Sequence, residues 1–287
     1  MTDSQEPVFG FTHTDLQERD TVFAPGLFDG RTVVVTGAGG GLGLAIASLF
    51  ARLGATLAIC GRNPEKLESA AEFLRSFGGD VLTQQMTIRD PEQAAAFVEA
   101  VHERFGRLDV LVNNAGGQFP QPALEYSVKG WNAVIDTNLN GTWWMMQSVA
   151  KKWVESGTSG NIVSIVADVW RGMPGIAHTA AARAGVIFLS KSVAVEWAPH
   201  GIRVNCVAPG CCESTGFGNY PAEGAATFKE SNPMRRAGDE WDVAEGVVYM
   251  AAPSGKFVTG EVLNVDGGQQ MWGDPWPTGR PEYFRIG

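Results

Sequence analysis

Short apolar runs alternate with longer amphipathic stretches along the chain from Arg31 onward. The runs predict strands buried on both faces of a parallel sheet, and they lie at 32–37, 56–61, 81–86, 108–114, 161–167, 202–210 and 261–268. The longer stretches predict helices, and they lie at 42–53, 64–77, 91–105, 129–155, 174–199 and 240–251. This alternation predicts a single doubly wound α/β domain with a parallel seven-stranded sheet and right-handed crossovers.

The same pattern predicts the limits of the domain. Residues 1–26 precede the first strand and are expected to form an exposed N-terminal arm, and residues 27–270 hold the domain. The stretch 211–234 breaks the alternation with Gly, Asn, Tyr and Pro, as substrate lids do. Residues 271–287 are expected to form a C-terminal tail.

Composition narrows the class of protein. With 287 residues, of which 44% are hydrophobic and 18% charged, the chain is long enough to bury a large core. The formal net charge of -9 has the wrong sign for binding a phosphate backbone, so no nucleic-acid partner is expected. No apolar run reaches the roughly 18 residues of a membrane-spanning helix, so no membrane association is expected.

The cysteines and the termini predict a cytoplasmic protein. The four cysteines lack paired CxxC spacing, so neither a disulfide framework nor a metal site is expected. The N-terminus has no basic region followed by an apolar core, and the C-terminal Arg-Ile-Gly is not a peroxisomal address.

A glycine-rich turn joins the first predicted strand to the first helix. In TGAGGGLG, Gly37 permits a tight turn, Gly41 lets the backbone approach a pyrophosphate, and Gly43 lets the helix pack closely on the strand. The turn is completed by Gly39, Gly40 and Leu42. Glycines can also occur at a turn only because the backbone there needs a positive φ. The position after the first strand of a βαβ unit favours dinucleotide binding instead.

The second predicted strand ends in Gly61, Arg62 and Asn63, without the acidic residue that binds a ribose 2′-hydroxyl. An arginine there can bind a 2′-phosphate, which a carboxylate would repel. Arg62, with Asn63 beside it, therefore predicts NADP(H) as the cofactor. The alternative is that Arg62 is a solvated residue flanking the next helix.

Further motifs follow in order: Asn113-Asn114-Ala115-Gly116 after the fourth strand, then Asn138, then Pro209-Gly210 after the sixth strand. Together with the glycine-rich turn, they resemble the short-chain dehydrogenase/reductase family over residues 27–270. The resemblance implies an oxidoreductase with a Rossmann fold. It also implies a homo-oligomer, a tetramer or a dimer, whose interface uses the two longest helices and residues 258–268.

The same resemblance implies positions around the cofactor. These are Thr87 and Ile88 at the adenine, Asn114, Ala115 and Gly116 at the adenosine ribose, Pro209 and Gly210 at the nicotinamide, and Ser214 or Thr215 near the carboxamide and the pyrophosphate.

Most members of this family carry a Ser after the fifth strand and a Tyr-x-x-x-Lys on the next helix, where the Lys lowers the pKa of the Tyr. In this chain the Ala-Gly-Val that follows the Lys aligns it with Arg183, so Thr179 stands at the Tyr and Ala167 at the Ser. Asn138 is retained. Threonine can donate a hydrogen bond but does not ionise near neutral pH. Arg183 can still bind the ribose hydroxyls of the cofactor.

The segment 178–183, HTAAAR, resembles the enoyl-CoA reductase branch of the family, and the peroxisomal trans-2-enoyl-CoA reductases in particular. Other similar stretches are 24–27, 113–119, 129–131, 181–186, 190–192, 196–197 and 203–210. This branch reduces a conjugated C=C, with charge developing on a thioester enolate, so the resemblance implies NADPH-dependent reduction of a 2-enoyl-CoA. Two alternatives remain: an alcohol or ketone oxidoreductase of lipid or acyclic isoprenoid catabolism, and a non-catalytic NADP-binding module.

The sequence leaves several candidates for the proton donor. Tyr220 lies in the predicted lid, and Asp168 follows the fifth strand, where burial could keep it protonated. Asp168 could instead be a cap or pair with Arg171. His178 is expected to pack rather than act as an acid, and a water held by Thr179 and Asn138 is equally consistent. Candidate cations for the CoA phosphate are Lys129, Arg171, Arg235 and Arg236.

Overall fold

Seven parallel strands lie in the order β3-β2-β1-β4-β5-β6-β7 at the centre of the computed structural model, which describes residues 9–216 and 230–271. The strands are β1 (Thr32–Thr36), β2 (Thr56–Gly61), β3 (Val81–Gln85), β4 (Val110–Asn113), β5 (Gly160–Ile165), β6 (Ile202–Pro209) and β7 (Val262–Val265). The predicted seven-stranded parallel sheet is confirmed. The strand order reverses between β1 and β4, and this reversal places the site described below.

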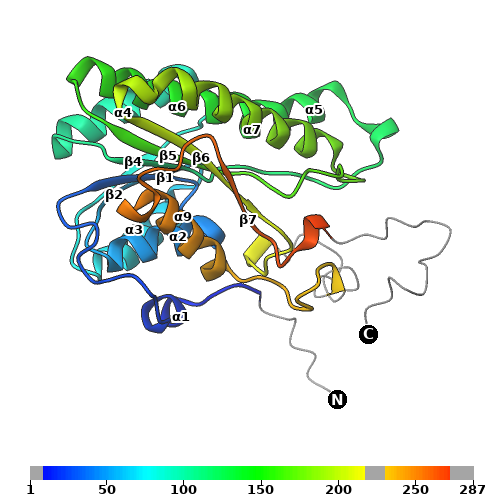
Figure 1. Ribbon diagram of the computed structural model, residues 1–287, viewed down its shortest axis with the longest axis horizontal. Coiled ribbons are helices and arrows are strands. Elements are labelled where there is room, and N and C mark those ends of the chain that lie inside the picture. Colours follow the sequence, from blue (N-terminus) through cyan, green and yellow to red (C-terminus); the bar gives the residue numbers. More distant parts are fainter. Residues whose placement is uncertain (1–8, 217–229, 272–287) are drawn as a thin grey trace.

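Helices cover both faces of the sheet (Figure 1). One face carries α2 (Gly41–Arg52), α3 (Pro64–Arg75) and α9 (Glu240–Ala251), and the other carries α4 (Pro91–Phe105), α6 (Gly141–Ser156) and α7 (Ala177–Trp197). Two shorter helices, α1 (His13–Glu18) and α5 (Val128–Ile135), pack against α2 and α7 respectively. Short 3₁₀ turns lie at Ala123–Glu125, Ala198–His200, Pro253–Gly255 and Gln269–Met271. Within the described ranges, no helix is long and apolar enough to cross a lipid bilayer.

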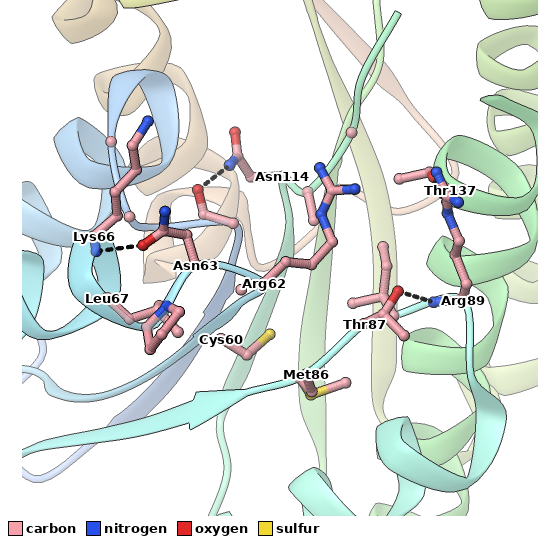
Figure 2. A pocket seen from close by; sticks show the side chains of 18 of the residues that line it. Cys60, Arg62, Asn63, Lys66, Leu67, Met86, Thr87, Arg89, Asn114 and Thr137 are labelled. Atoms are coloured by element: carbon pink, nitrogen blue, oxygen red, sulfur yellow. Dashed lines mark hydrogen bonds between the residues drawn. The ribbon is translucent and has the colours of Figure 1, made fainter. Parts of the chain in front are cut away.

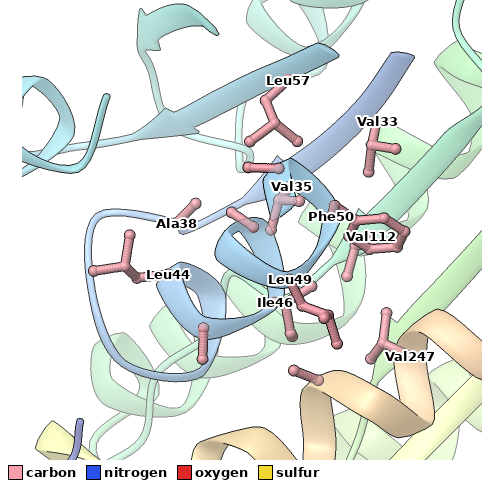
Figure 3. Packing of buried hydrophobic residues seen from close by; sticks show 14 of the residues in the cluster. Val33, Val35, Ala38, Leu44, Ile46, Leu49, Phe50, Leu57, Val112 and Val247 are labelled. Atoms are coloured by element: carbon pink, nitrogen blue, oxygen red, sulfur yellow. The ribbon is translucent and has the colours of Figure 1, made fainter. Parts of the chain in front are cut away.

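The central strands are apolar on both faces, because consecutive side chains of a strand point to opposite sides. Val33 and Val35 pack toward α2, whereas Val34 packs into the second core on the far side. Figure 3 shows the first of these cores, formed by Val33, Val35, Leu57 and Val112 of the sheet against Leu44, Ile46, Leu49 and Phe50 of α2 and Val247 of α9. This double burial fixes the carboxyl ends of the strands, where the site lies.

Helices α3 and α4 begin at a proline that follows a capping side chain. Oδ1 of Asn63 accepts from the amide of Lys66 at 2.9 Å, and Oδ1 of Asp90 accepts from the amide of Glu92 at 2.9 Å. Proline is suited to the first helical position, because no intrahelical partner awaits its missing N–H. The predicted starts at residues 64 and 91 are therefore confirmed, and both caps hold strand-end loops in place.

Two segments differ from the sequence prediction. The helix predicted over 129–155 is divided by a π-helical turn, Asp136–Asn140, which lies between α5 and α6. The sequence also predicts an exposed N-terminal arm; in the described part of the arm most residues are exposed, but residues 13–18 form α1, and Leu16 within it is only 1% exposed. Apolar packing of Leu16 in the core of the α2 face explains this difference.

Candidate active site

The glycine-rich turn lies where the strand order reverses, the place at which open α/β sheets bind ligands. Gly37 (φ 69°) and Gly41 (φ 56°) adopt the left-handed conformation that favours glycine. A Cβ on Gly43 would collide with the carbonyl oxygen of Gly37. These geometries agree with the tight turn and the close helix packing predicted for this segment.

Asn114 and Thr36 fasten this turn to the end of β4. The Asn114 side-chain amide donates to the carbonyl oxygens of Thr36 at 3.0 Å and Gly37 at 3.2 Å. In return, the Thr36 hydroxyl oxygen accepts from the backbone amides of Asn114 at 3.0 Å and Ala115 at 2.9 Å. The side chain of Asn114 therefore holds the glycine-rich turn, and the backbone from Ala115 to Gly116 is left to face a ligand.

A cavity of about 670 Å³ opens beside the turn (Figure 2). Residues that the sequence places at the cofactor line much of it: Gly37, Gly39, Gly40, Arg62, Asn63, Thr87, Ile88, Asn114, Ala115, Gly116 and Thr215. The lining residues that sequence reasoning missed are Cys60, Gly61, Pro64, Lys66, Leu67, Met86, Arg89 and Thr137. A helix capped at Asn63 could have pointed to Lys66, which lies in the first turn of that helix.

The cavity is electropositive. Its lining holds the cations Arg62, Lys66 and Arg89, and none of the described lining residues is a carboxylate. Nε of Arg89 donates to the Thr137 hydroxyl at 2.5 Å, whereas the Arg62 guanidinium forms no hydrogen bond or ion pair with the part of the chain that the structure describes. In Figure 2, Arg62 extends from the end of β2 toward the side of the cavity where Arg89 and Thr137 lie.

Other predicted cofactor residues lie outside the lining of this cavity. They are Gly41, Leu42, Gly43, Arg183, Pro209, Gly210 and Ser214. The amide of Gly210 donates to Val265 O at 3.0 Å, which fixes the end of β6 against β7. Their predicted contacts with the cofactor stay predictions.

Asn138 joins the π-helical turn to the loop after β4. Its Nδ2 donates to the carbonyl oxygens of Gly117 at 2.7 Å and Val134 at 2.9 Å, and its Oδ1 accepts from the Gly117 amide at 3.2 Å. The side chain is fully buried. Both N–H donors of the Asn138 side chain are used inside the protein, so this residue holds the loop in place. Only its Oδ1 can accept a further hydrogen bond, from a water or a ligand.

Arg183 lies beside the same loop. It is 9% exposed, and its NH1 donates to Ile165 O at 2.7 Å. A Cβ on Gly116 would collide with the Arg183 guanidinium and with Oδ1 of Asn138, so glycine at 116 makes room for both side chains. Burial lowers the pKa of Arg183 to about 10, which keeps the guanidinium charged at neutral pH. The fold thus brings Asn138, Arg183 and Gly116 together.

Thr179 and His178 form a buried pair at the start of α7. The amide of Thr179 donates to Nδ1 of His178 at 2.7 Å, and the Thr179 hydroxyl lies 3.2 Å from the same nitrogen. The His178 ring stacks on Tyr126 and meets Phe119 edge to face, at centroid distances of 4.5 and 4.7 Å. Burial lowers the pKa of His178, so the ring is neutral at pH 7, as a packing residue is expected to be.

Asp168 follows β5 and reaches the end of β6. Its backbone amide donates to Pro209 O at 3.3 Å, which places it beside the strand end expected at the nicotinamide. The pKa of Asp168 is raised by burial and by the nearby Asp266 carboxylate, against smaller opposing effects of the Trp170 backbone amide and of Arg171. A carboxyl with this shift retains its proton to higher pH than a solvated aspartate, as a proton donor must.

The remaining candidates are the tyrosines considered as proton donors and the cations considered for the CoA phosphate. Tyr220 falls outside the described residues. The Tyr126 hydroxyl donates to Gly175 O at 3.0 Å and accepts from the Ala177 amide at 3.1 Å, so its hydrogen bonds hold the start of α7. Of the cations considered for a CoA phosphate, Arg236 pairs with Asp242 at 2.6 Å and Arg171 donates to Gln270 O.

Comparison with known proteins agrees with this geometry. The family model described as Enoyl-(Acyl carrier protein) reductase matches residues 37–270. The chain is 36% identical to the peroxisomal 2,4-dienoyl-CoA reductase of Danio rerio, over 86% of this chain and 84% of that protein. The chain belongs to the short-chain dehydrogenase/reductase family.

Solved structures of the family share the fold. The citronellol catabolism dehydrogenase of Pseudomonas aeruginosa PAO1 is 39% identical with a TM-score of 0.79, covering 88% of this chain and 99% of that one. A short chain dehydrogenase from Bacillus anthracis is also 39% identical with a TM-score of 0.79, covering 86% of this chain and 99% of that one.

Membership makes the protein an oxidoreductase whose fold binds a nicotinamide dinucleotide. The residues present fit such a cofactor: the left-handed glycines open the turn at the start of α2, and the cavity beside it carries cations without a carboxylate.

Proposed function

We propose that the protein is an NADPH-dependent reductase of the conjugated C=C of an acyl-CoA, either a 2-enoyl-CoA or a 2,4-dienoyl-CoA. The observation that carries the proposal is the replacement of all three usual proton-handling residues, by Ala167, Thr179 and Arg183, in a site that keeps its cofactor cavity and Asn138. The name of the Danio rerio relative supports the substrate class.

The preference for NADPH is supported by charge. A 2′-phosphate at the end of β2 would meet Arg62 and Lys66 and no acidic side chain among the described lining residues. Charge-assisted hydrogen bonds from guanidinium to phosphate are short and strong. An enzyme selective for NADH would instead carry a carboxylate at this strand end.

The cofactor, when bound, supplies a hydride to a carbon of the conjugated system. The protein must then hold the charge that forms on the thioester oxygen and deliver one proton to carbon. We assign the proton to the Asp168 carboxyl, whose surroundings raise its pKa above that of a solvated aspartate. Arg183 is expected to orient the nicotinamide ribose from its buried position, and Asn138 holds the loop against which that ribose would lie.

Absorbance of the reduced nicotinamide tests this proposal. Purified protein with NADPH and either crotonyl-CoA or 2,4-hexadienoyl-CoA should oxidise the cofactor only when the acyl-CoA is present, and NADH should be a poorer donor. Mass spectrometry should show a product two hydrogens heavier. A protein that binds NADPH and reduces neither thioester contradicts the proposal.

A second candidate is oxidation of an acyclic isoprenoid alcohol, favoured by the 39% identity to the citronellol catabolism dehydrogenase. It is distinguished by incubation with citronellol and NADP⁺, where reduction of the cofactor would support it. Binding of NADPH without turnover of any of these substrates would support a non-catalytic module instead.

We also propose a homo-oligomer that buries α6 and α7. Phe188 and Val195, seven residues apart on α7, are 64% and 77% exposed, and Val154 on α6 is 44% exposed. Exposed apolar side chains on neighbouring helices favour association. Light scattering should give a dimer or tetramer, and Phe188→Asp should lower its mass. The cytoplasmic location predicted from the sequence stays a prediction.

A further inference from the structure

A buried carboxylate with no role in the proposed chemistry lies at the first residue of α9. Glu240 is 2% exposed. Its Oε2 accepts from the amide of Phe11 at 3.1 Å, across 229 positions of sequence. Its Oε1 forms no hydrogen bond of good geometry within the described ranges, although the Thr215 amide is near enough to lower the pKa of the carboxyl. A buried oxygen without a partner costs free energy, so the position calls for an explanation.

The first turn of α9 is the docking point of the N-terminal arm. On either side of Glu240, Asp239 pairs with Arg19 at 2.6 Å and the Trp241 indole donates to Asp20 O at 2.9 Å. The N-cap residue of α9 and the first two residues of the helix thus hold the arm by three different contacts. The arm lies on the α2 and α9 side of the sheet, where α1 is seen in Figure 1.

The arm also lies close to Thr215, a residue that lines the cofactor cavity. Gly10 has φ 85°, and a Cβ there would lie 2.8 Å from the Thr215 amide nitrogen and 3.1 Å from Oε1 of Glu240. A Cβ on Gly41 would lie 3.1 Å from the Thr215 hydroxyl and 3.7 Å from the same Oε1. Glu240 therefore stands between the arm, the glycine-rich turn and Thr215, which lines the cavity at the beginning of the predicted lid.

We propose that Glu240 is a positioning residue that couples docking of the N-terminal arm to binding of the dinucleotide, by holding Gly10 and Phe11 against Thr215 and the glycine-rich turn. Coupling of this kind is reciprocal: the arm raises the affinity for the cofactor, and the cofactor stabilises the docked arm to the same extent. The inference rests on the dinucleotide site of the proposed function, but on neither the acyl-CoA substrate nor the preference for NADPH.

The charge around Glu240 is compatible with this role. Burial raises the pKa of Glu240, and the carboxylates of Asp239 and Glu213 raise it further, while the amides of Phe11 and Thr215 oppose the shift. The raised pKa disfavours the charged form, which would repel the diphosphate of a bound dinucleotide, and Oε2 can accept from the Phe11 amide whether or not the carboxyl is charged. Glu240→Gln should therefore keep the coupling, whereas Glu240→Ala should remove it.

Hydrogen exchange of residues 9–20, with and without saturating NADPH or NADH, measures the coupling in the full-length protein. In the parent, the dinucleotide should slow exchange of the arm. In Glu240→Ala, the arm should exchange faster, the dissociation constant should rise by about 5-fold or more, and the dinucleotide should no longer protect the arm. Glu240→Gln should resemble the parent in exchange of the arm, in the dissociation constant and in protection of the arm by the dinucleotide. A purely structural loss in Glu240→Ala would not change protection of the arm by the dinucleotide.

Gly10→Ala tests the contact from the side of the arm, with Gly78→Ala as its matched control. Both glycines have a left-handed φ, 85° and 92°, but a Cβ on Gly78 meets nothing within 4 Å. Both variants should lose some thermal stability, and only Gly10→Ala should weaken cofactor binding. Equal dissociation constants for the two variants would overturn the inference.

The outcomes separate this inference from the proposed function. A parent that binds neither dinucleotide overturns the site and the inference together. A parent that binds one of them, with exchange of residues 9–20 unchanged, overturns the inference and leaves the site intact.

Discussion

At the cofactor end of the site the chain acts mainly through its backbone, whereas at the substrate end it acts through side chains. Gly37, Gly41 and Gly43 serve by conformation and by the absence of a Cβ. Asp168, Thr179 and Arg183 serve, in our proposal, by what their side chains can donate. A backbone role follows from residue type at one position, but a side-chain role depends on what surrounds it.

The two ends also differ in electrostatic surroundings. The cofactor cavity gathers Arg62, Lys66 and Arg89 without a described carboxylate, which suits a polyanion. At the substrate end, burial and the nearby Asp266 carboxylate raise the pKa of Asp168. In our proposal the first arrangement serves binding and the second serves proton transfer, so substitutions at the two ends should affect different kinetic constants.

Asp168→Asn should give the largest loss and affect the substrate end alone. General acid catalysis contributes about 10²–10⁴-fold, so kcat should fall by that order while the dissociation constant for NADPH is unchanged. Our proposal makes the acid form of Asp168 the donor, and its pKa is raised, so kcat of the parent should fall as pH rises through that pKa.

Asp266→Asn is the control for this pH effect. Removing the neighbouring carboxylate should lower the pKa of Asp168 and move the alkaline limb of the kcat profile to lower pH. If the dependence of kcat on pH is unchanged in both Asp168→Asn and Asp266→Asn, another group donates the proton. Tyr220→Phe is then the next variant to measure.

Arg183→Ala should cost about 10²-fold in kcat/KM, the order expected when a positioning contact at the reacting centre is lost. Arg183→Lys should recover part of it, because lysine is the residue most members of the family carry here.

Gly116→Ala and Gly117→Ala form a matched pair for the Arg183 contact. A Cβ at 116 collides with the Arg183 guanidinium, whereas a Cβ at 117 meets nothing within 4 Å. Only the first should reproduce the defect of Arg183→Ala in steady-state kinetics, and equal activities of the two variants would argue against the placement.

The difference between the two ends explains how much could be predicted from sequence. The sheet, the starts of α3 and α4, and the glycine-rich turn were predictable, because local conformation and capping chemistry determine them. Lys66 and Arg89 were missed because the cavity is closed by the first turn of α3 and by the loop after β3, whose approach to each other is a tertiary result. The π-helical turn at Asn138 has no periodic signal of its own.

The substrate end was harder to predict for a physical reason. The replacements at 167, 179 and 183 are visible in the sequence, but the surroundings that raise the pKa of Asp168 include Asp266, which is 98 positions away. Likewise, nothing local shows that Glu240 is buried against Phe11. Such pairings follow from the packing of the N-terminal arm and the last strand onto the domain.

Arg62→Asp should break the cofactor end while sparing the substrate end. Loss of a charge-assisted hydrogen bond of about 1.5–3 kcal/mol corresponds to a change of roughly 10- to 150-fold in the ratio of NADPH to NADH dissociation constants. Fluorescence titration of both cofactors measures this ratio, and Lys66→Ala should change it less because its flexible ammonium forms a single point contact. Equal affinities in the parent would contradict the preference itself.

Thr179→Ala should give the smallest effect, a loss in kcat of no more than about 10-fold, below the 10²–10³-fold typical of a dedicated donor to developing charge. The Thr179 hydroxyl lies 3.2 Å from Nδ1 of His178, and this nitrogen already accepts from the Thr179 amide. The single lone pair of this nitrogen is already engaged by the amide, so the hydroxyl can at most share it. The hydroxyl can donate one hydrogen bond to a substrate oxygen, but threonine does not ionise near neutral pH and is a poor source of the proton. Thr179→Ser, which keeps the hydroxyl, should match the parent when acyl-CoA reduction is measured at saturating NADPH. A loss in Thr179→Ala as large as that in Asp168→Asn would place the proton chemistry on α7, where most of the family has it, and would argue against Asp168 as the proton donor.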